Sequence, residues 1–281
     1  MKQTSILSLG AAALLFAACG QSTTKTETTG QDTAKPVYTR LSLVPTGSSP
    51  EFPNAQLAIK DVTAQKAGTD SATVTFNFDV KNYELKMQTA DTGTKLCSNS
   101  AQGQHIHFIM DNKPYKALYE PTNKITLANN SEHYLMAFLS RSYHESLKNK
   151  GAAVVYHFKI DEKGNLKKLE DPTTPMVFYS RPKGDYLGKD TANVLLDFYV
   201  WNCTLSPDGY KVKAVISNDT RGTAYDTTLM ITDWKSNFIQ NLGVGKSNIT
   251  LTLVDKDGNT AAYPSSIASH SVTLAAQEPM K

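Results

Sequence analysis

The stretch "FNFDVKNYEL" (76–85) decides the fold, because its pattern returns later in the chain. Apolar and polar residues alternate through "FNFDV", and this period of two is typical of a half-buried β-strand. The stretch "LDFYVWNCTL" (196–205) carries Phe, Val, Asn and Leu at the matching positions. A pattern that recurs in this way predicts two copies of one β unit.

Short apolar or alternating runs continue on both sides of these two stretches. They are rich in Val, Ile, Thr, Phe and Tyr and are separated by Gly, Asn, Asp and Pro, as in "HIHFIM", "HYLMAFL", "AAVVYHFKI", "YKVKAVI" and "SNITLTLV". No window of helical length keeps a period of 3.6 residues, and "SRSYHESLKNKG" suits at most a short helix or turn. The sequence therefore predicts an all-β fold of two tandem immunoglobulin-like antiparallel β-sandwiches.

The order of the matching stretches sets the domain boundaries. "HIHFIMDNK" can be aligned with "TTLMITDWK", and "HYLMAFLSR" with "NITLTLVDK". We predict a first sandwich over residues 37–170 and a second, supporting sandwich over residues 171–281. The linker between them is "DEKGNLKKLEDPTTP" (161–175).

The N-terminus has the features of an exported protein. Lys2 precedes the apolar run "ILSLGAAALLFAA" (6–18), which is too short for a membrane span and predicts a signal peptide over residues 1–18. Cys19 follows in "FAACG", which resembles the lipobox of bacterial lipoproteins and implies lipidation of that cysteine. An ordinary signal peptide followed by a chance cysteine is the alternative.

Residues 19–36 are rich in Thr, Ser and Gln and contain no large apolar residue, so we expect a disordered tether. A lipid, a tether and a folded body predict a protein anchored to the bacterial cell envelope, on the periplasmic or outer-membrane face. The formal net charge is only +3. That value argues against a nucleic-acid partner, which leaves the membrane and a small ligand or protein as partners.

Two histidines stand one residue apart in "GQHIHFIMDNKPY" (103–115). On a strand, His105 and His107 share a face, while Ile106 and Phe108 face the core. Two imidazoles at this spacing suit a copper or zinc ion bound at about 2 Å. The third ligand stays open: the tentative metal set is His105, His107 and His133, and His144, Cys97 and Asp111 are further candidates.

The second copy serves as an internal comparison. In the alignment above, Thr227 and Leu229 take the positions of His105 and His107, and Asn248 lies opposite His133. Five of the six histidines lie in the first copy. We therefore expect that the fold does not require the histidine pair, and that a small-ligand function belongs to the first sandwich.

A second polar group lies in "LSRSYHES" (139–146). Arg141, Tyr143, His144 and Glu145, with the neighbouring serines, form a candidate ligand-binding set for a carboxylate or a phosphate. Metal binding, a polar ligand and structural hydrogen bonding all remain open for the histidines.

Several of these stretches together resemble a known family. "GQHIHFIMDNKPYKALYE", "AFLSRSYHESLK", "YSRPKGDYLG" and "LLDFYVWN" are similar to sequences in a family of uncharacterised bacterial exported proteins, which often carry the label phosphopeptide-binding protein. The likeness covers most of the body. It implies a ligand site on Arg141, His144, His105 and His107.

The cysteines allow a disulfide. With Cys19 lipidated, Cys97 and Cys203 remain in an oxidising compartment, where an even remainder predicts a bridge. Two free thiols, or Cys97 as a ligand, are the alternatives. We also expect Tyr199, Trp201 and Cys203 to form an outward stripe that the first sandwich covers.

Catalytic motifs are incomplete. "GVGKSN" lacks the first glycine of a phosphate-binding loop, there is no Gly-x-Ser-x-Gly elbow, and no carboxylates stand as a pair. The sequence therefore favours a binding protein with a His-centred site. The alternative is a structural or protein-interaction lipoprotein with no small-ligand site, whose Trp201 stripe meets a partner.

Overall fold

The alternating patterns become β-strands throughout residues 39–262 and 265–276, which are the residues described in this computed structural model. The signal segment 1–18, Cys19 and the tether 19–36 lie outside the described residues. Within the described ranges the helical elements are two short 3-10 turns, η1 (Gly188–Thr191) and η2 (Thr223–Tyr225). None of the helices described there has the length and apolar character needed to cross a membrane.

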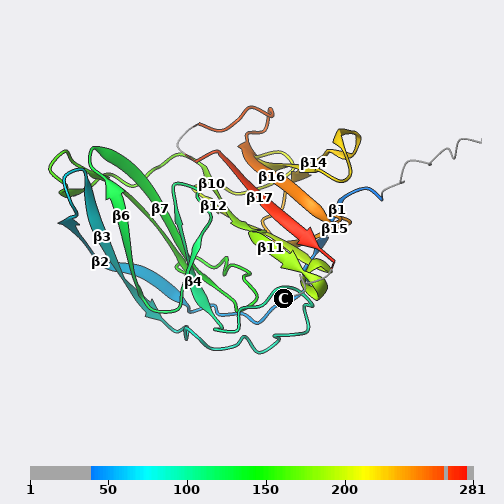
Figure 1. Cartoon of the computed structure of the whole chain (residues 1–281), viewed down its shortest axis with the longest axis horizontal. Helices are drawn as coiled ribbons and strands as arrows, with labels where there is room; N and C mark the ends of the chain where they lie inside the picture. The colour runs from blue at the N-terminus through cyan, green and yellow to red at the C-terminus, as the bar shows by residue number, and fades with distance from the viewer. Residues whose placement is uncertain (1–38, 263–264, 277–281) are drawn as a thin grey trace, which may run out of the picture. The chain divides into compact units, whose positions relative to one another are not determined.

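Two sheets form the first sandwich (Figure 1). The smaller sheet has the order β2-β3-β6 and the larger sheet the order β5-β4-β7-β8-β9. The bounds are β2 (Gln56–Lys66), β3 (Ser71–Lys81), β4 (His105–Met110), β5 (Lys116–Leu118), β6 (Thr122–Ala128), β7 (Ser131–Ser140), β8 (Ala153–Ile160) and β9 (Leu166–Lys168).

The second sandwich repeats this plan, with sheets in the orders β1-β15-β12-β10 and β11-β17-β16-β13-β14. The bounds are β1 (Ser42–Pro45), β10 (Met176–Arg181), β11 (Gly184–Leu187), β12 (Val194–Trp201), β13 (Lys211–Asn218), β14 (Thr227–Ile231), β15 (Asn237–Gln240), β16 (Gly245–Val254) and β17 (Ile267–Ala275). The expectation of tandem immunoglobulin-like antiparallel sandwiches is confirmed.

The repeat extends to the pairing of individual residues. The equivalent pairs are Leu57 with Val80 and Ile59 with Phe78 in the first copy, and Val177 with Val200 and Tyr179 with Phe198 in the second. Each copy then has a β-bulge, after Ile59 in β2 and after Tyr179 in β10. Because a bulge inserts one unpaired residue and bends the strand, the equivalent strands of the two copies bend at the same point.

Sheet order corrects one strand of the sequence alignment. β4 lies between β5 and β7, as β13 lies between β14 and β16, so the counterpart of β4 is β13 rather than β14. Ile106 pairs with Leu139 and Val212 with Leu253, each pair inside its own core. Lys211 and Lys213, one residue to either side of Val212, are therefore the counterparts of the two histidines. The second copy folds without imidazoles at these two positions, so the fold does not require the histidine pair.

One strand crosses the predicted domain boundary. β1 pairs with β15 at the edge of the second sandwich, although it precedes β2 in the chain. Leu41, just before β1, belongs to the core of the second sandwich. The segment 46–55 then leads from the second sandwich back to the first.

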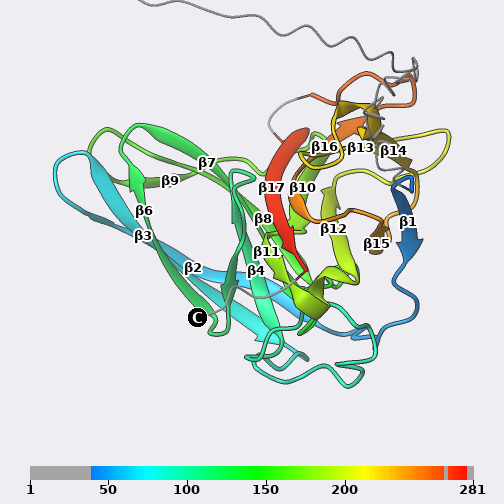
Figure 2. The same ribbon diagram turned by 45° about the vertical axis from the view of Figure 1, so that its right-hand side comes forward.

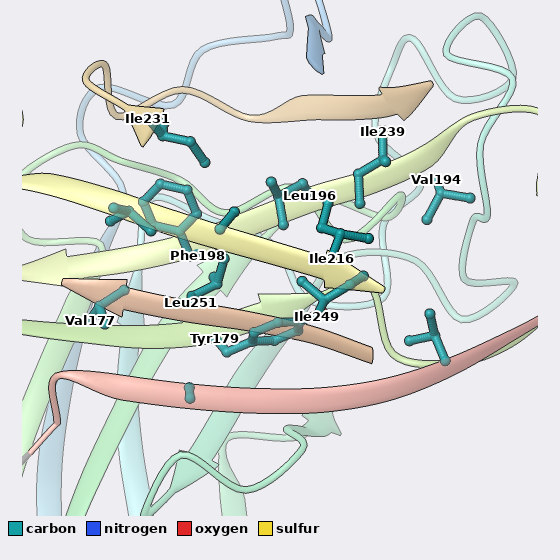
Figure 3. Close-up of a cluster of buried hydrophobic side chains, with 14 of the residues drawn as sticks. Val177, Tyr179, Val194, Leu196, Phe198, Ile216, Ile231, Ile239, Ile249 and Leu251 are labelled. Carbon is teal, nitrogen blue, oxygen red and sulfur yellow. The ribbon is translucent and has the colours of Figure 1, made fainter. Parts of the chain in front are cut away.

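Apolar side chains fill three consecutive layers. One core lies between the two sheets of the first sandwich and another between the two sheets of the second. Figure 3 shows the latter, where Phe198 and Leu196 of β12 point toward Leu251 and Ile249 of β16.

The third layer is the junction between the sandwiches, where β4, β7 and β8 pack on β10 and β12. Figure 2 shows β4 between the β2–β3 pair and the β10–β12 pair. The buried apolar residues of this junction layer are Ile109, Tyr115, Met136, Phe138, Val155, Met176, Phe178 and Tyr199. Phe138 stacks on Tyr199 with ring centroids 5.0 Å apart.

The outward stripe is covered as expected for two of its three residues. Tyr199 is buried in the junction and Trp201 packs against it. Cys203 instead packs against the core of the second sandwich. Asn202 explains the difference, because its left-handed φ of 56° breaks the strand alternation.

The expected Cys97–Cys203 disulfide is not formed, and both residues are free cysteines. Burial raises the pKa of each thiol to about 11, so both are neutral thiols at pH 7.

Truncation of the junction should destabilise the protein. We expect Tyr199→Ala to lower the free energy of unfolding by about 3–5 kcal/mol, because it removes a buried aromatic ring that packs on Phe138. Urea denaturation monitored by fluorescence measures the change. Met230→Ala, at a side chain that is 48 % exposed, is the control and should change stability by less than about 0.5 kcal/mol. A Tyr199→Ala loss as small as that of the control would contradict the junction.

Candidate metal centre

Three histidines converge in the junction. His105 and His107 on β4 are 0 % exposed, and His144 in the loop between β7 and β8 is 8 % exposed. One ring nitrogen from each lies within 4.8 Å of the other two. The expected pair on one strand face is therefore real, and His144 supplies the third nitrogen that the sequence left open.

Local backbone geometry aims the three rings at one point. β4 places His105 and His107 on the face opposite Ile106 and Phe108, which belong to the first core. His144 closes a tight turn, in which its N–H donates to Arg141 O at 2.9 Å. Its φ of 69° is left-handed, a conformation in which histidine is enriched among non-glycine residues.

The hydrogen bonds of the rings fix which nitrogens are free. His105 Nδ1 lies 2.7 Å from Gly103 O, so it carries the proton and leaves a lone pair on Nε2. That single lone pair faces His107 Nε2 at 3.0 Å and His144 Nδ1 at 3.1 Å. One lone pair accepts one good hydrogen bond, so His105 Nε2 cannot accept from both neighbouring rings.

These two separations, out of the three in the cluster, suit a shared ion. Ligand nitrogens placed tetrahedrally at 2.0–2.1 Å from an ion lie about 3.3 Å apart. The observed 3.0 and 3.1 Å are close to that value. His107 Nδ1 lies 3.0 Å from Ser180 Oγ, so two of the three rings are also held from behind, as metal-binding imidazoles usually are.

Burial keeps the three imidazoles neutral, which is the form that binds a metal. It lowers the pKa of His105 to about 4, although the Gly103 carbonyl opposes the shift. It also holds the pKa of His107 and of His144 well below 6.5, and the neighbouring Arg181 lowers both further.

Tyr115 is a fourth group at the cluster. Its ring stacks on His107 with centroids 3.6 Å apart and planes 9° from parallel. Its hydroxyl lies 3.2 Å from His144 Nδ1. The Tyr115 hydroxyl therefore lies beside His144 and can donate a hydrogen bond to its Nδ1.

The second sandwich contributes residues that the sequence reasoning missed. Ser180 is the bulge residue of β10, and Arg181 and Lys183 follow it. In the sequence, the stretch "YSRPKGDY" indicated a family resemblance but no role at the histidines. A serine beside two cations in an otherwise apolar stretch was the available signal, but it did not indicate which strand it would face.

His133 does not join the cluster. Its Nδ1 lies 2.7 Å from Asp111 Oδ2, and its Nε2 lies 2.7 Å from Ser131 Oγ. On β7 it stands five residues from Phe138, the partner of His107, which is roughly 16 Å of strand. The metal set with His133 as third ligand is therefore corrected to His105, His107 and His144.

The loop set divides between two places. His144 turns to the histidine pair, whereas Arg141 donates to Pro50 O at 2.6 Å and Glu145 accepts from Ser49 Oγ at 2.6 Å. Tyr143 donates to an Asp91 carboxylate oxygen at 3.3 Å.

Arg141 and Glu145 also line a pocket of about 500 Å³, together with Lys148 and Trp234. Ligand binding by Arg141, Tyr143 and Glu145 stays a prediction, and it concerns a place separate from the three rings.

Comparisons with known proteins add no identity. No family model matches the chain, and no curated protein matches it. Among solved structures, the fibronectin(III)-like modules of Clostridium thermocellum CbhA are 12% identical, with a TM-score of 0.26, over 78% of this chain and 94% of that one. The chicken interferon gamma receptor alpha chain is 8% identical, with a TM-score of 0.24, over 79% and 99%. Scores this low carry no argument about function.

Acid should destabilise the metal-free protein. The folded-state pKa of His105 lies below its unfolded value of 6.5, so this contribution to stability is complete above pH 6.5 and is lost as the pH falls toward 4. His105 alone accounts for roughly 3 kcal/mol over that window. Urea midpoints measured in chelator from pH 7.5 to 4.5 give the change.

His105→Asn should show a shallower loss over the same pH range, whereas Met230→Ala, at an exposed side chain without a titratable group, should follow the wild type. Equal slopes for wild type and His105→Asn would contradict the buried neutral imidazole.

Proposed function

We propose that this protein binds a divalent transition metal, zinc or copper, through His105, His107 and His144, and does so as a lipid-anchored protein of the bacterial cell envelope. The observation that carries the proposal is the convergence of three buried ring nitrogens within 4.8 Å of one another. Imidazole nitrogen is a preferred donor for both metals.

Three further features support a metal over a purely structural cluster. The rings are buried and neutral, so no proton has to leave before a metal binds. The supports behind His105 and His107 fix their orientation. Three protein nitrogens with a fourth position open to water are typical of catalytic zinc sites, and the Tyr115 hydroxyl lies beside His144 Nδ1 at 3.2 Å.

The envelope location rests on sequence alone. The apolar run before Cys19 and the polar tether after it support export and lipidation.

The rival function is a structural or protein-interaction lipoprotein. An immunoglobulin-like fold by itself fits such a role. Its proposed partner surface was the stripe at Trp201, but Tyr199 and Trp201 of that stripe pack in the junction with the first sandwich. The sequence had indicated no other partner surface for this rival. Among the described residues, the surface that it did indicate is therefore not free for a partner.

Metal analysis of the purified protein tests the proposal. We expect one zinc or copper ion per chain after loading and desalting, measured by mass spectrometry of the metal. His107→Ala should lose the ion, because the cluster then keeps only two nitrogens. Ser180→Ala should weaken binding by about 10- to 100-fold, because it removes the support of the His107 ring.

His133→Ala is the matched control and should bind as the wild type does. Absence of stoichiometric metal in the wild type, or an equal loss in His133→Ala and His107→Ala, would sink the proposal.

A further inference from the structure

Arg181 is a buried cation without a carboxylate partner in the part of the chain that the structure describes. It is 6 % exposed, and none of the ion pairs in the described ranges includes it. Its Nη1 donates to Lys183 O at 3.2 Å and to the Tyr186 hydroxyl at 3.1 Å. Both acceptors are neutral, so neither compensates the guanidinium charge.

The acidic residue opposite Arg181 in the β10–β12 ladder, Asp197, is already paired with another cation. Its Oδ1 accepts from Lys148 Nζ at 2.9 Å and from the hydroxyls of Ser146 and Ser236 at 2.8 Å. Its Oδ2 is buried and has no hydrogen-bond partner among the described residues. The ammonium of Lys148 therefore offsets the charge of this carboxylate, and no ion pair joins Asp197 to Arg181.

A second cation stands beside the first. Lys183 Nζ donates to Tyr115 O at 2.6 Å and lies 4.4 Å from the centroid of the Tyr115 ring. Arg181 Cζ lies 5.7 Å from the same centroid. Both positive charges thus meet at the ring that stacks on His107 and whose hydroxyl faces His144.

Among the described residues, the other titratable groups beside Arg181 supply no negative charge. Burial raises the pKa of the Cys97 thiol to about 11, and it raises the pKa values of Tyr115 and Tyr186 above their usual 10. All three are neutral at pH 7. The histidines are neutral as well, so the environment of Arg181 carries a net positive charge.

Arg181 also keeps donors to spare. Among the described residues, its Nε and Nη2 have no hydrogen-bond partner. Both atoms keep some accessibility to solvent, so an added ligand can reach them. They form one edge of the planar guanidinium, the fork that binds two oxygens of an oxyanion side by side.

We infer that Arg181 and Lys183 form an anion site next to the histidine cluster, which takes a small oxyanion such as phosphate or a carboxylate. Buried charges in proteins are almost always paired, and the described residues contain no partner for Arg181. The site does not require the metal. An anion there would also offset the two positive charges beside a bound metal ion.

Calorimetric titration of inorganic phosphate and of acetate tests the inference, with chloride as the common background ion. Each is added to metal-stripped and to zinc-loaded protein. We expect one site in the wild type in both states. Arg181→Met should bind roughly 10- to 100-fold more weakly, because it loses a charged, two-pronged donor but keeps the side-chain volume.

Lys189→Gln, which removes an equal charge at an exposed position nearby, is the matched control and should bind as the wild type does. Arg181→Met removes an unpaired buried charge and should melt no lower than the wild type in buffer that contains neither phosphate nor acetate. Lys183→Met, at a half-buried position, provides a second variant with weaker anion binding.

Two results would overturn the site: no binding of either anion to the wild type, or equal binding by wild type and Arg181→Met. Binding only to zinc-loaded protein that survives Arg181→Met would assign the anion to the metal and overturn the site as well. Binding of one anion alone supports it and identifies the preferred oxyanion.

Metal content is measured on the same samples. Anion binding without metal uptake would refute the proposed function alone, and metal uptake without anion binding would refute the anion site alone.

Discussion

The packing of β4 and β7 against β10 and β12 places two otherwise independent sandwiches face to face, and every feature of the site depends on it. One face of β4 is apolar and fills the core of the first sandwich. The other face carries His105 and His107, which are both buried. Tyr115 and Phe138 of the first sandwich contact His107, and Ser180 in the bulge of β10 contacts it from the second sandwich. Burial of that face therefore places a cluster of histidine rings in the interior of the protein.

Low local polarity has two linked effects at this centre. It makes the protonated imidazoles unfavourable, so the three rings stay neutral with lone pairs to donate. It also makes the isolated charge of Arg181 unfavourable, because no carboxylate among the described residues forms an ion pair with it. A protein built for stability alone would place an apolar or a paired residue at either position. The junction instead holds nitrogen donors and a cation together, an arrangement that suits the joint binding of a metal and an anion.

The sequence predicted those parts of the molecule that follow from local pattern. Alternation revealed the strands, and the match between residues 76–85 and 196–205 revealed the repeat, down to an equivalent asparagine in left-handed backbone at 82 and 202. The shared face of His105 and His107 followed from the strand period. The comparison with the second copy reached a correct conclusion through the wrong strand, because β13 and β14 both alternate and only sheet order distinguishes them.

The remaining residues of the site depend on geometry that no local pattern encodes. His144 joins the cluster and His133 does not, because a left-handed turn directs one ring while the length of β7 separates the other. Ser180 and Arg181 reach the histidines from a bulge in the other sandwich, and their position depends on how the two sandwiches dock. Cys203 likewise faces the inner core because Asn202 breaks the alternation that the sequence reasoning had extended through it.

The central claim is that three imidazoles from β4 and the β7–β8 loop hold one ion. X-ray absorption at the zinc or copper edge of the loaded protein tests it most directly, because the first shell reports ligand type and distance without a crystal. A three-histidine site predicts a first shell of three imidazole nitrogens at about 2.0 Å and one further light atom. A first shell of oxygens alone, or an imidazole signal that is unchanged in a His105→Ala/His107→Ala protein, would contradict it.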